Sequence, residues 1–223
     1  MSSRVAFPEV PDCCNPSGYE SLFNRKESRR ALRVYDKRGL NKMARRIVDY
    51  LDSRGVEGDR ILEVGGGIGA AHVELLKAGA VSAVNVELSH GYQDAAAELL
   101  RREGLEGRVE QRIGDFTELA EGMEADDVIM NRVICCYPDM ERLMNAALSV
   151  SGRFLAVTFP RDRVVSRLWV GVESVYYRIK GVAFRPYVHS PRAILETARR
   201  AGFEVVFEDR DLMWHGAVFG RTS

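Results

Sequence analysis

The sequence predicts an α/β protein with a mostly parallel sheet of seven strands, an antiparallel last strand and helices on both faces. One observation behind this expectation is that short apolar segments alternate with helical segments along most of the chain, which is typical of a parallel sheet whose strands are joined by helices. The other is that the connection between the last two apolar segments is too short for a parallel crossover. Together they predict a Rossmann-like architecture.

Apolar spacing and capping residues place the elements in order. Asn41 and Ser190 are typical N-cap residues, Pro191 suits the first turn of a helix, and Gly202 ends the last helix. The expected strands are residues 60–64, 81–87, 108–113, 128–131, 153–159, 203–208 and 212–219. The expected helices are residues 23–38, 40–51, 69–78, 89–100, 138–148 and 191–201.

Charge and composition exclude several classes of protein. The chain of 223 residues suits one domain and can bury a core without disulfides or a structural metal. Its net charge is zero, which argues against a generic nucleic-acid binder or a polybasic membrane protein. The charge is unevenly distributed, because residues 25–54 carry a net +7 and the remainder a net −7.

No targeting or membrane segment is evident. There is no run of about 18 apolar residues, and the first residues lack the apolar core of a signal peptide. We therefore expect a cytoplasmic protein with reduced cysteines. The four cysteines form two adjacent pairs, Cys13–Cys14 and Cys135–Cys136, so the usual zinc spacing is missing and no metal is expected.

A glycine-rich turn follows the first expected strand. Gly65, Gly67 and Gly69 lie between strand 60–64 and the next helix. Glycines let a ligand approach the backbone, and the helix N-terminus offers free N–H groups to a polar ligand. The same residues, with Ala70, also satisfy the dinucleotide fingerprint, so a nicotinamide-dependent oxidoreductase is an alternative at this point.

Three acidic residues accompany this turn. Glu63 comes two residues before the first glycine. Glu87 ends the next strand, where a carboxylate can accept both ribose hydroxyls, although dinucleotide folds share this feature. Asp115 and Phe116 follow the third strand, where an acid can accept from an adenine amino group while an aromatic ring covers the base.

These motifs resemble those of class I S-adenosylmethionine-dependent methyltransferases, and the resemblance covers about residues 41–223. It implies that S-adenosylmethionine is the cofactor and that residues 1–40 form an N-terminal segment over the active site. By the same resemblance, Glu63 supports the cofactor's amino-acid end from below the loop. The implied cofactor-binding residues are Tyr35, Glu63, Gly65, Gly67, Gly69, Glu87, Leu88, Asp115, Phe116, Asn131 and Arg132.

The segment after the fourth strand bears on the methyl acceptor. Enzymes that methylate base amino groups usually carry Asn/Asp-Pro-Pro-Tyr/Phe here, whereas this chain reads Asn131-Arg132-Val133-Ile134. The general pattern is similar to small-molecule methyltransferases. Residues 135–139 and 159–161 also resemble bacterial proteins described as magnesium-protoporphyrin O-methyltransferase-like. We therefore expect a small organic acceptor; an RNA methyltransferase using residues 25–54 and a non-catalytic cofactor-binding module are the alternatives.

An insertion at residues 163–189 separates the fifth strand from the last helix. It carries an apolar helical stripe and then several aromatic residues, and insertions here commonly build the substrate wall of this fold. Alternatively, the helix simply packs on the core. The candidate wall residues are Trp169, Tyr176, Tyr177, Arg185, Tyr187 and His189.

Two residues are candidates for a catalytic role. His189 is the candidate general base because its ordinary pKa lies near neutrality, with a purely structural histidine as the alternative. Tyr137 is the candidate for orienting the acceptor. A separate hypothesis is that one thiol from each cysteine pair meets near the pocket, where the two bind a soft metal or form a redox-sensitive bridge. The sequence leaves the oligomeric state open.

Overall fold

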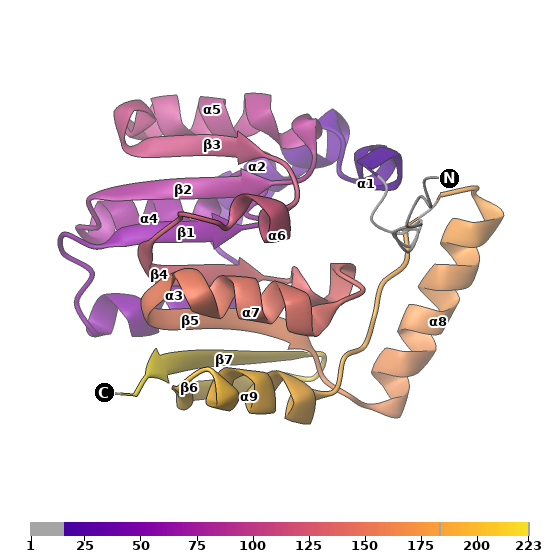
Figure 1. The fold of residues 1–223 in the computed structure, drawn as a ribbon. Helices are drawn as coiled ribbons and strands as arrows, with labels where there is room; N and C mark the ends of the chain where they lie inside the picture. Colours follow the sequence, from indigo (N-terminus) through magenta and orange to yellow (C-terminus); the bar gives the residue numbers. More distant parts are fainter. Residues whose placement is uncertain (1–15, 183, 223) are drawn as a thin grey trace, which may run out of the picture.

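The computed structural model describes residues 16–182 and 184–222, and it confirms the predicted architecture (Figure 1). Seven strands form one sheet in the order β3-β2-β1-β4-β5-β7-β6. Only β7 runs against the others, since it is antiparallel to both β5 and β6. The strands are β1 (Arg60–Val64), β2 (Ser82–Glu87), β3 (Val109–Ile113), β4 (Ala125–Asn131), β5 (Ser151–Pro160), β6 (Phe203–Arg210) and β7 (Trp214–Arg221).

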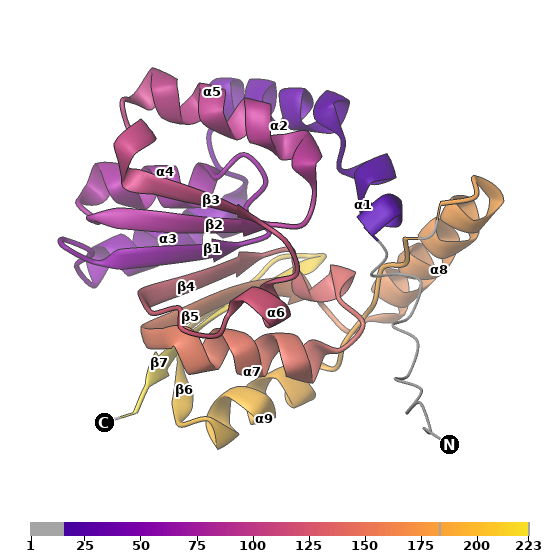
Figure 2. The same ribbon diagram turned by 45° about the horizontal axis from the view of Figure 1, so that its top comes forward.

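Helices cover both faces of this sheet (Figures 1 and 2). One core lies under α6 (Phe116–Leu119), α7 (Met140–Val150) and α9 (Pro191–Arg200). The other lies under α2 (Arg25–Arg38), α3 (Lys42–Ser53), α4 (Ala70–Ala78) and α5 (Gln93–Glu103). The shorter elements are α1 (Pro16–Leu22) and the 3₁₀ turns η2 (His90–Tyr92), η3 (Glu106–Arg108) and η4 (Ile134–Cys136).

Local signals set most helix ends. The Asn41 side chain accepts from the backbone N–H of Ala44, and Pro191 occupies the first turn of α9, as expected. The predicted strand 128–131 is too short, because Ala125 and Asp127 already pair with β5. The prediction missed this start because Asp127 is a charged residue inside a buried strand.

A buried ion pair explains that charge. Asp127 is fully buried, and the guanidinium of Arg153 donates to both of its carboxylate oxygens, at 3.0 and 2.7 Å. Arg153 also donates to Asp59 and to the carbonyl of Gly55. Burial raises the pKa of Asp127, and the hydrogen bonds from Arg153 oppose that shift. This network joins the segment before β1 to the beginnings of β4 and β5.

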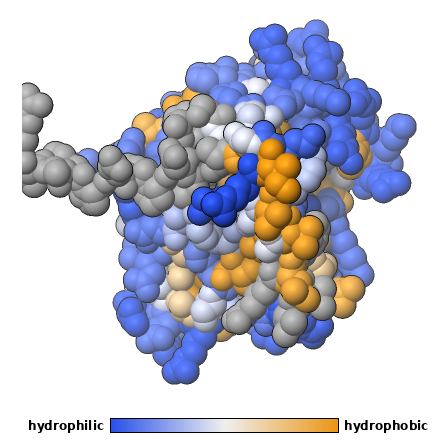
Figure 3. Space-filling view, turned by 90° about the vertical axis from the view of Figure 1, so that its right-hand side faces the viewer, coloured by the Kyte–Doolittle hydropathy of each residue, from blue (hydrophilic) through white to orange (hydrophobic). Residues whose placement is uncertain are grey.

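The helix of the insertion, α8 (Val164–Ile179), stands apart from the body of the domain (Figure 2). It does not simply pack on the core, because several of its apolar side chains face solvent (Figure 3). The exposed ones are Leu168, Val172, Val175, Tyr176 and Ile179. Among the described residues, no helix is long and apolar enough to cross a membrane.

We expect Arg153→Met to lower the free energy of unfolding by about 3–5 kcal/mol, because it leaves the buried carboxylate of Asp127 without its partner. Urea denaturation measures the change. Arg200→Met is the matched control; it removes an exposed pair with Glu196 one helical turn away and is expected to cost below about 0.5 kcal/mol. Equal effects of the two substitutions would contradict this account.

Candidate cofactor and acceptor site

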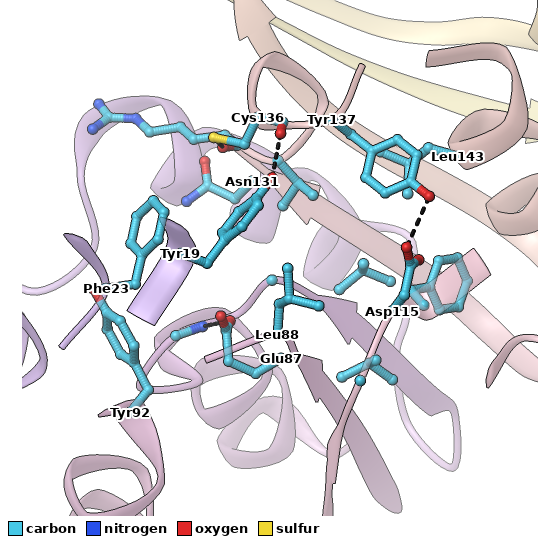
Figure 4. Close-up of a pocket in the computed structure, with 18 residues that line it drawn as sticks. Tyr19, Phe23, Glu87, Leu88, Tyr92, Asp115, Asn131, Cys136, Tyr137 and Leu143 are labelled. Carbon is cyan, nitrogen blue, oxygen red and sulfur yellow. Dashed lines mark hydrogen bonds between the residues drawn. The ribbon is translucent and has the colours of Figure 1, made fainter. Parts of the chain in front are cut away.

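A pocket opens at the carboxyl ends of β1–β4, where open α/β sheets bind their ligands (Figure 4). The cavity measures about 210 Å³ and is partly open to solvent. It is lined by Tyr19, Phe23, Val64, Gly65, Gly67, Val86, Glu87, Leu88, Tyr92, Gly114, Asp115, Phe116, Asn131, Arg132, Val133, Cys136, Tyr137 and Leu143.

The turn after β1 requires glycine. Gly65, Gly67 and Gly69 have φ values of 61°, 59° and 80°, which side-chain-bearing residues rarely adopt. A Cβ atom on Gly65 would lie 2.7 Å from the side chain of Val133. The turn is therefore pressed against the segment after β4. Gly65 and Gly67 line the pocket, whereas Gly69 caps α4.

Glu63 supports the turn from beneath. Its side chain is buried, and one carboxylate oxygen accepts from the backbone N–H of His72 at 3.0 Å and lies 2.8 Å from Nδ1 of the same residue. Glu63 is not among the residues that line the pocket. It anchors the start of α4 and thereby fixes the glycine turn from below, whereas its implied role at the cofactor's amino-acid end stays a prediction.

Glu87 sits where β2 ends and connects two parts of the site. Its Oε2 accepts from the backbone N–H of Gly67 at 3.0 Å, and its Oε1 accepts from that of Ser89 at 3.4 Å. Burial raises the pKa of Glu87, and these backbone hydrogen bonds oppose the rise. The carboxylate faces the pocket, so it can still accept hydrogen bonds from a ligand (Figure 4).

Asp115 and Tyr137 meet at another wall of the pocket (Figure 4). The Tyr137 hydroxyl donates to Oδ2 of Asp115 at 2.9 Å, while Oδ1 accepts from the backbone N–H of Thr117 at 2.8 Å. Burial raises the pKa of Tyr137 to about 12. Phe116 and Leu88 line the same pocket, so the residues expected around adenine gather as predicted. Tyr137 therefore lies beside Asp115, among the residues expected around adenine.

The end of β4 carries the strained residue Arg132. Its φ is 62°, and it is the only non-glycine residue with a positive φ in the described ranges 16–182 and 184–222. Its backbone N–H donates to Oγ1 of Thr158 at 2.7 Å, and that hydroxyl donates to Oδ1 of Asn131 at 2.9 Å. The guanidinium lies 4.4 Å from the centre of the Trp214 ring. Asn131 and Arg132 both line the pocket.

Two aromatic residues that the sequence analysis missed close the pocket from the N-terminal side. The Tyr19 hydroxyl on α1 donates to the backbone carbonyl of Cys136 (Figure 4), and its ring stacks on Phe23 at 5.7 Å between centres. Glu20 holds the same helix by accepting from the backbone N–H of His90 at 2.7 Å. Neither residue belongs to a motif, and Phe23 was placed only at the start of the expected helix 23–38.

Tyr35 does not take the predicted place over the cofactor. Its hydroxyl donates to Oε1 of Glu74 on α4 at 2.5 Å, and it does not line the pocket. Helical periodicity directs it to the interface between α2 and α4 instead, next to Arg45, which pairs with the same carboxylate at 2.7 Å. The N-terminal aromatic residues that do reach the pocket are Tyr19 and Phe23.

The insertion contributes less to the pocket wall than predicted. Tyr176 and Arg185 are exposed and do not line the pocket, and the side chain of Trp169 lies outside the described part of the structure. Tyr177 instead packs edge-on against the buried ring of Phe184, which in turn packs against Tyr19. The insertion therefore supports α1.

His189 and Tyr187 brace the loop that follows β4. The ring of His189 donates through Nε2 to the backbone carbonyl of Tyr137 at 2.9 Å, and the backbone N–H of Tyr187 donates to the carbonyl of Cys135 at 2.7 Å. The two rings stack at 5.7 Å. Burial lowers the pKa of His189. Neither side chain lines the pocket, and this geometry favours the alternative, a structural histidine.

The hypothesis that one thiol from each cysteine pair meets near the pocket can be compared with the structure only in part, since Cys13 and Cys14 lie outside the described residues. Cys135 and Cys136 are not in a strand but in η4, and their Sγ atoms lie 3.8 Å apart. Cys136 lines the pocket.

Much of the basic stretch 25–54 is engaged within the fold. Arg25 pairs with Asp94 at 3.2 Å and Arg45 with Glu74 at 2.7 Å, and Arg46 pairs with Asp209. These acids come from α5, α4 and β6, outside the stretch itself. The local excess of positive charge is thus partly neutralised by acids that are distant in sequence.

Comparison with known proteins agrees with the site. Residues 62–151 match the family model described as a methyltransferase domain. No curated protein matches the sequence. These 90 residues include the glycine turn, Glu87, Asp115 and Asn131, so the match covers the elements that form the pocket.

Solved structures share the fold. Magnesium protoporphyrin IX methyltransferase from Synechocystis PCC 6803 with bound SAH has a TM-score of 0.72 and 19% identity, covering 95% of this chain and 100% of that chain. The same enzyme with bound SAM has a TM-score of 0.67 and 18% identity, covering 99% of this chain and 100% of that chain. An O-methyltransferase family protein from Burkholderia thailandensis has a TM-score of 0.67 and 21% identity, covering 92% of this chain and 63% of that chain.

The matched domain, the sheet order and the pocket at the carboxyl ends of β1–β4 agree with one another. Residues 62–151 match a methyltransferase domain, and the chain has the fold of solved methyltransferases.

Proposed function

We propose that this enzyme transfers the methyl group of S-adenosylmethionine to a small organic acceptor by direct displacement. The observation that carries the proposal is that Glu87 and the glycine turn line one cavity with Asn131, Arg132 and aromatic side chains of α1. The cofactor-binding residues and the space beyond them are therefore continuous. The similar structure from Synechocystis, a magnesium protoporphyrin IX methyltransferase, supports an organic acceptor of this kind.

The residues present fit the cofactor. Glu87 accepts from the ribose hydroxyls, and Asp115 and Leu88 lie at the adenine. Gly65 and Gly67 have no side chains, so the cofactor's amino-acid end can approach the backbone there. A Cβ atom on Gly67 would lie 3.1 Å from the ring of Tyr92. When bound, S-adenosylmethionine supplies a methyl group activated by its sulfonium.

The acceptor enters between the end of β4 and α1. Tyr19 and Phe23 provide an aromatic wall that excludes water, and Arg132 adds a positive charge to the lining of the same cavity. Orientation of the two reactants contributes most of the lowering of the activation barrier, roughly 7–11 kcal/mol in well-aligned reactions. Tyr137 fixes Asp115, and His189 fixes the loop that carries both Cys136 and Tyr137, so these two are positioning residues.

Calorimetry and a labelling experiment test the proposal. Binding of S-adenosylmethionine and S-adenosylhomocysteine, with no binding of NAD, is the expected result, and the reverse would favour the nicotinamide alternative. Methyl-labelled S-adenosylmethionine is then incubated with the enzyme and either the small-molecule or the RNA fraction of a cell extract. Label in the small-molecule fraction supports the proposal, label in RNA alone contradicts it, and label in neither favours a non-catalytic module.

Glu87→Ala is expected to weaken S-adenosylhomocysteine binding roughly 10- to 100-fold, because hydrogen bonds to a charged group contribute about 1.5–3 kcal/mol each. Isothermal titration calorimetry measures the loss. Glu110→Ala is the matched control, since Glu110 is an exposed carboxylate on β3 that pairs with Arg112 outside the pocket. An unchanged affinity in Glu87→Ala would contradict the ribose role.

Cofactor binding is expected to weaken as the pH is lowered from neutrality toward the ordinary range of a glutamate carboxyl. Burial raises the pKa of Glu87 above its ordinary value of 4.5, so the free carboxyl takes up a proton at a higher pH than an ordinary glutamate does. Donation from the ribose hydroxyls requires the charged form, and binding therefore releases that proton. Calorimetry in two buffers of different ionisation enthalpy measures the release, and Glu87→Gln should abolish it. A proton release that persists in this variant would refute the assignment.

His189→Phe is expected to lower the free energy of unfolding by about 1–3 kcal/mol, because the carbonyl of Tyr137 loses its donor while the ring stack on Tyr187 is kept. Affinity for S-adenosylhomocysteine should not change. Denaturation and calorimetry measure the two quantities. His90→Phe, at an exposed position, is the control. A stability unchanged from wild type would argue against the positioning role.

A further inference from the structure

The two adjacent thiols at the end of β4 have no part in the proposed function. Cys135 and Cys136 lie in η4, and their Sγ atoms are 3.8 Å apart. Both Sγ atoms also lie near one backbone carbonyl, that of Arg132, at 3.5 and 3.6 Å. The thiols therefore point to the same side of the chain.

This placement follows from the backbone. In a strand, adjacent side chains point to opposite faces and two neighbouring thiols diverge. Here the positive φ of Arg132 ends β4, and the chain turns into η4, where Cys136 N–H donates to the carbonyl of Val133 at 2.8 Å. The contacts of Tyr19 with the carbonyl of Cys136 and of Tyr187 with that of Cys135 hold the turn from two sides.

The two thiols also shift each other's pKa values. The hydrogen bond from Cys136 lowers the pKa of Cys135, and the positive charge of Arg132 acts in the same direction. The same hydrogen bond and burial raise the pKa of Cys136. The first proton of the pair therefore leaves more easily than that of an ordinary thiol, and binding of a thiophilic ligand displaces the second.

The sulfur separation defines the ligand geometry. Thiolate bonds to zinc are about 2.3 Å long and those to arsenic are similar, so two sulfurs 3.8 Å apart subtend an angle of about 110° at a shared ligand atom. Within the part of the chain that the structure describes, no third Cys, His, Asp or Glu completes a cluster. This donor set does not satisfy zinc, which takes four ligands. It suits a three-coordinate atom that brings its own third substituent.

From this geometry we propose that Cys135 and Cys136 form a vicinal dithiol site for a monosubstituted trivalent arsenical, on the wall of the pocket that the acceptor enters. Cys136 lines that cavity, so the substituent on the ligand atom extends into it. The aromatic rings of Tyr19 and Phe23 line the same cavity and suit an apolar substituent.

The binding step balances without an oxidant or reductant. In phenylarsine oxide the arsenic carries one phenyl group and one oxygen. Two arsenic–sulfur bonds form, the arsenic–oxygen bonding is lost, and the oxygen leaves as water with the two thiol protons. The arsenic keeps its trivalent state, and the product is a cyclic dithioarsenite spanning Cys135 and Cys136.

The test uses the reduced full-length chain with phenylarsine oxide as the probe. The chain has four cysteines, so the double substitution Cys13→Ser with Cys14→Ser leaves only the pair in question. In this background we expect one equivalent of phenylarsine oxide by native mass spectrometry and protection of both thiols from alkylation. Binding of S-adenosylhomocysteine shows that the protein is folded.

Single substitutions then separate chelation from attachment to one thiol. Cys135→Ser or Cys136→Ser in the same background should weaken binding roughly 100-fold or more, because the second bond no longer forms within the same molecule. Protection of neither thiol or of only one in the two-cysteine background would overturn the proposal. Because that background contains no other thiols, the result decides the question even if a single variant fails to fold.

Discussion

The site depends on one hydrogen bond, from the backbone N–H of Gly67 to the carboxylate of Glu87. It ties the turn after β1 to the end of β2, and the lack of a side chain on Gly67 leaves room for the ring of Tyr92. Glu63 fixes the same turn from below through His72, and Val133 presses on it from the side. The cavity therefore has a floor set by three neighbouring strands, and α1 and η4 add to its walls.

This division explains what the sequence predicts well. The strand pattern, the glycine turn, Glu87 and Asp115 are encoded by residues close together in the chain, and the structure brings them together as expected. The antiparallel position of the last strand also follows from a local feature, the short connection before it. Boundaries were predicted less well where long-range pairing overrides local preference, as at Asp127, whose charge is offset by Arg153 on another strand.

The predicted site residues that lie outside the pocket have a common physical cause, which is that a side chain's direction depends on partners distant in sequence. Tyr35 has the right residue type to cover a cofactor, yet Glu74 on α4 takes its hydroxyl. His189 has a suitable ordinary pKa, yet the carbonyl of Tyr137 takes its ring N–H. Tyr19 carried no motif, and it reaches the pocket because α1 is held against Ser89 and His90 by Glu20.

The position of β7 bears on how the chain is synthesised and folded. This strand is the last in the sequence, yet it lies between β5 and β6 in the sheet. Until its residues leave the ribosome, β5 has an unpaired edge and β6 has no neighbour with which to pair. Exposed edges of this kind template association between chains. Completion of the sheet therefore waits for β7, and the unfinished sheet is most prone to association before this strand is in place.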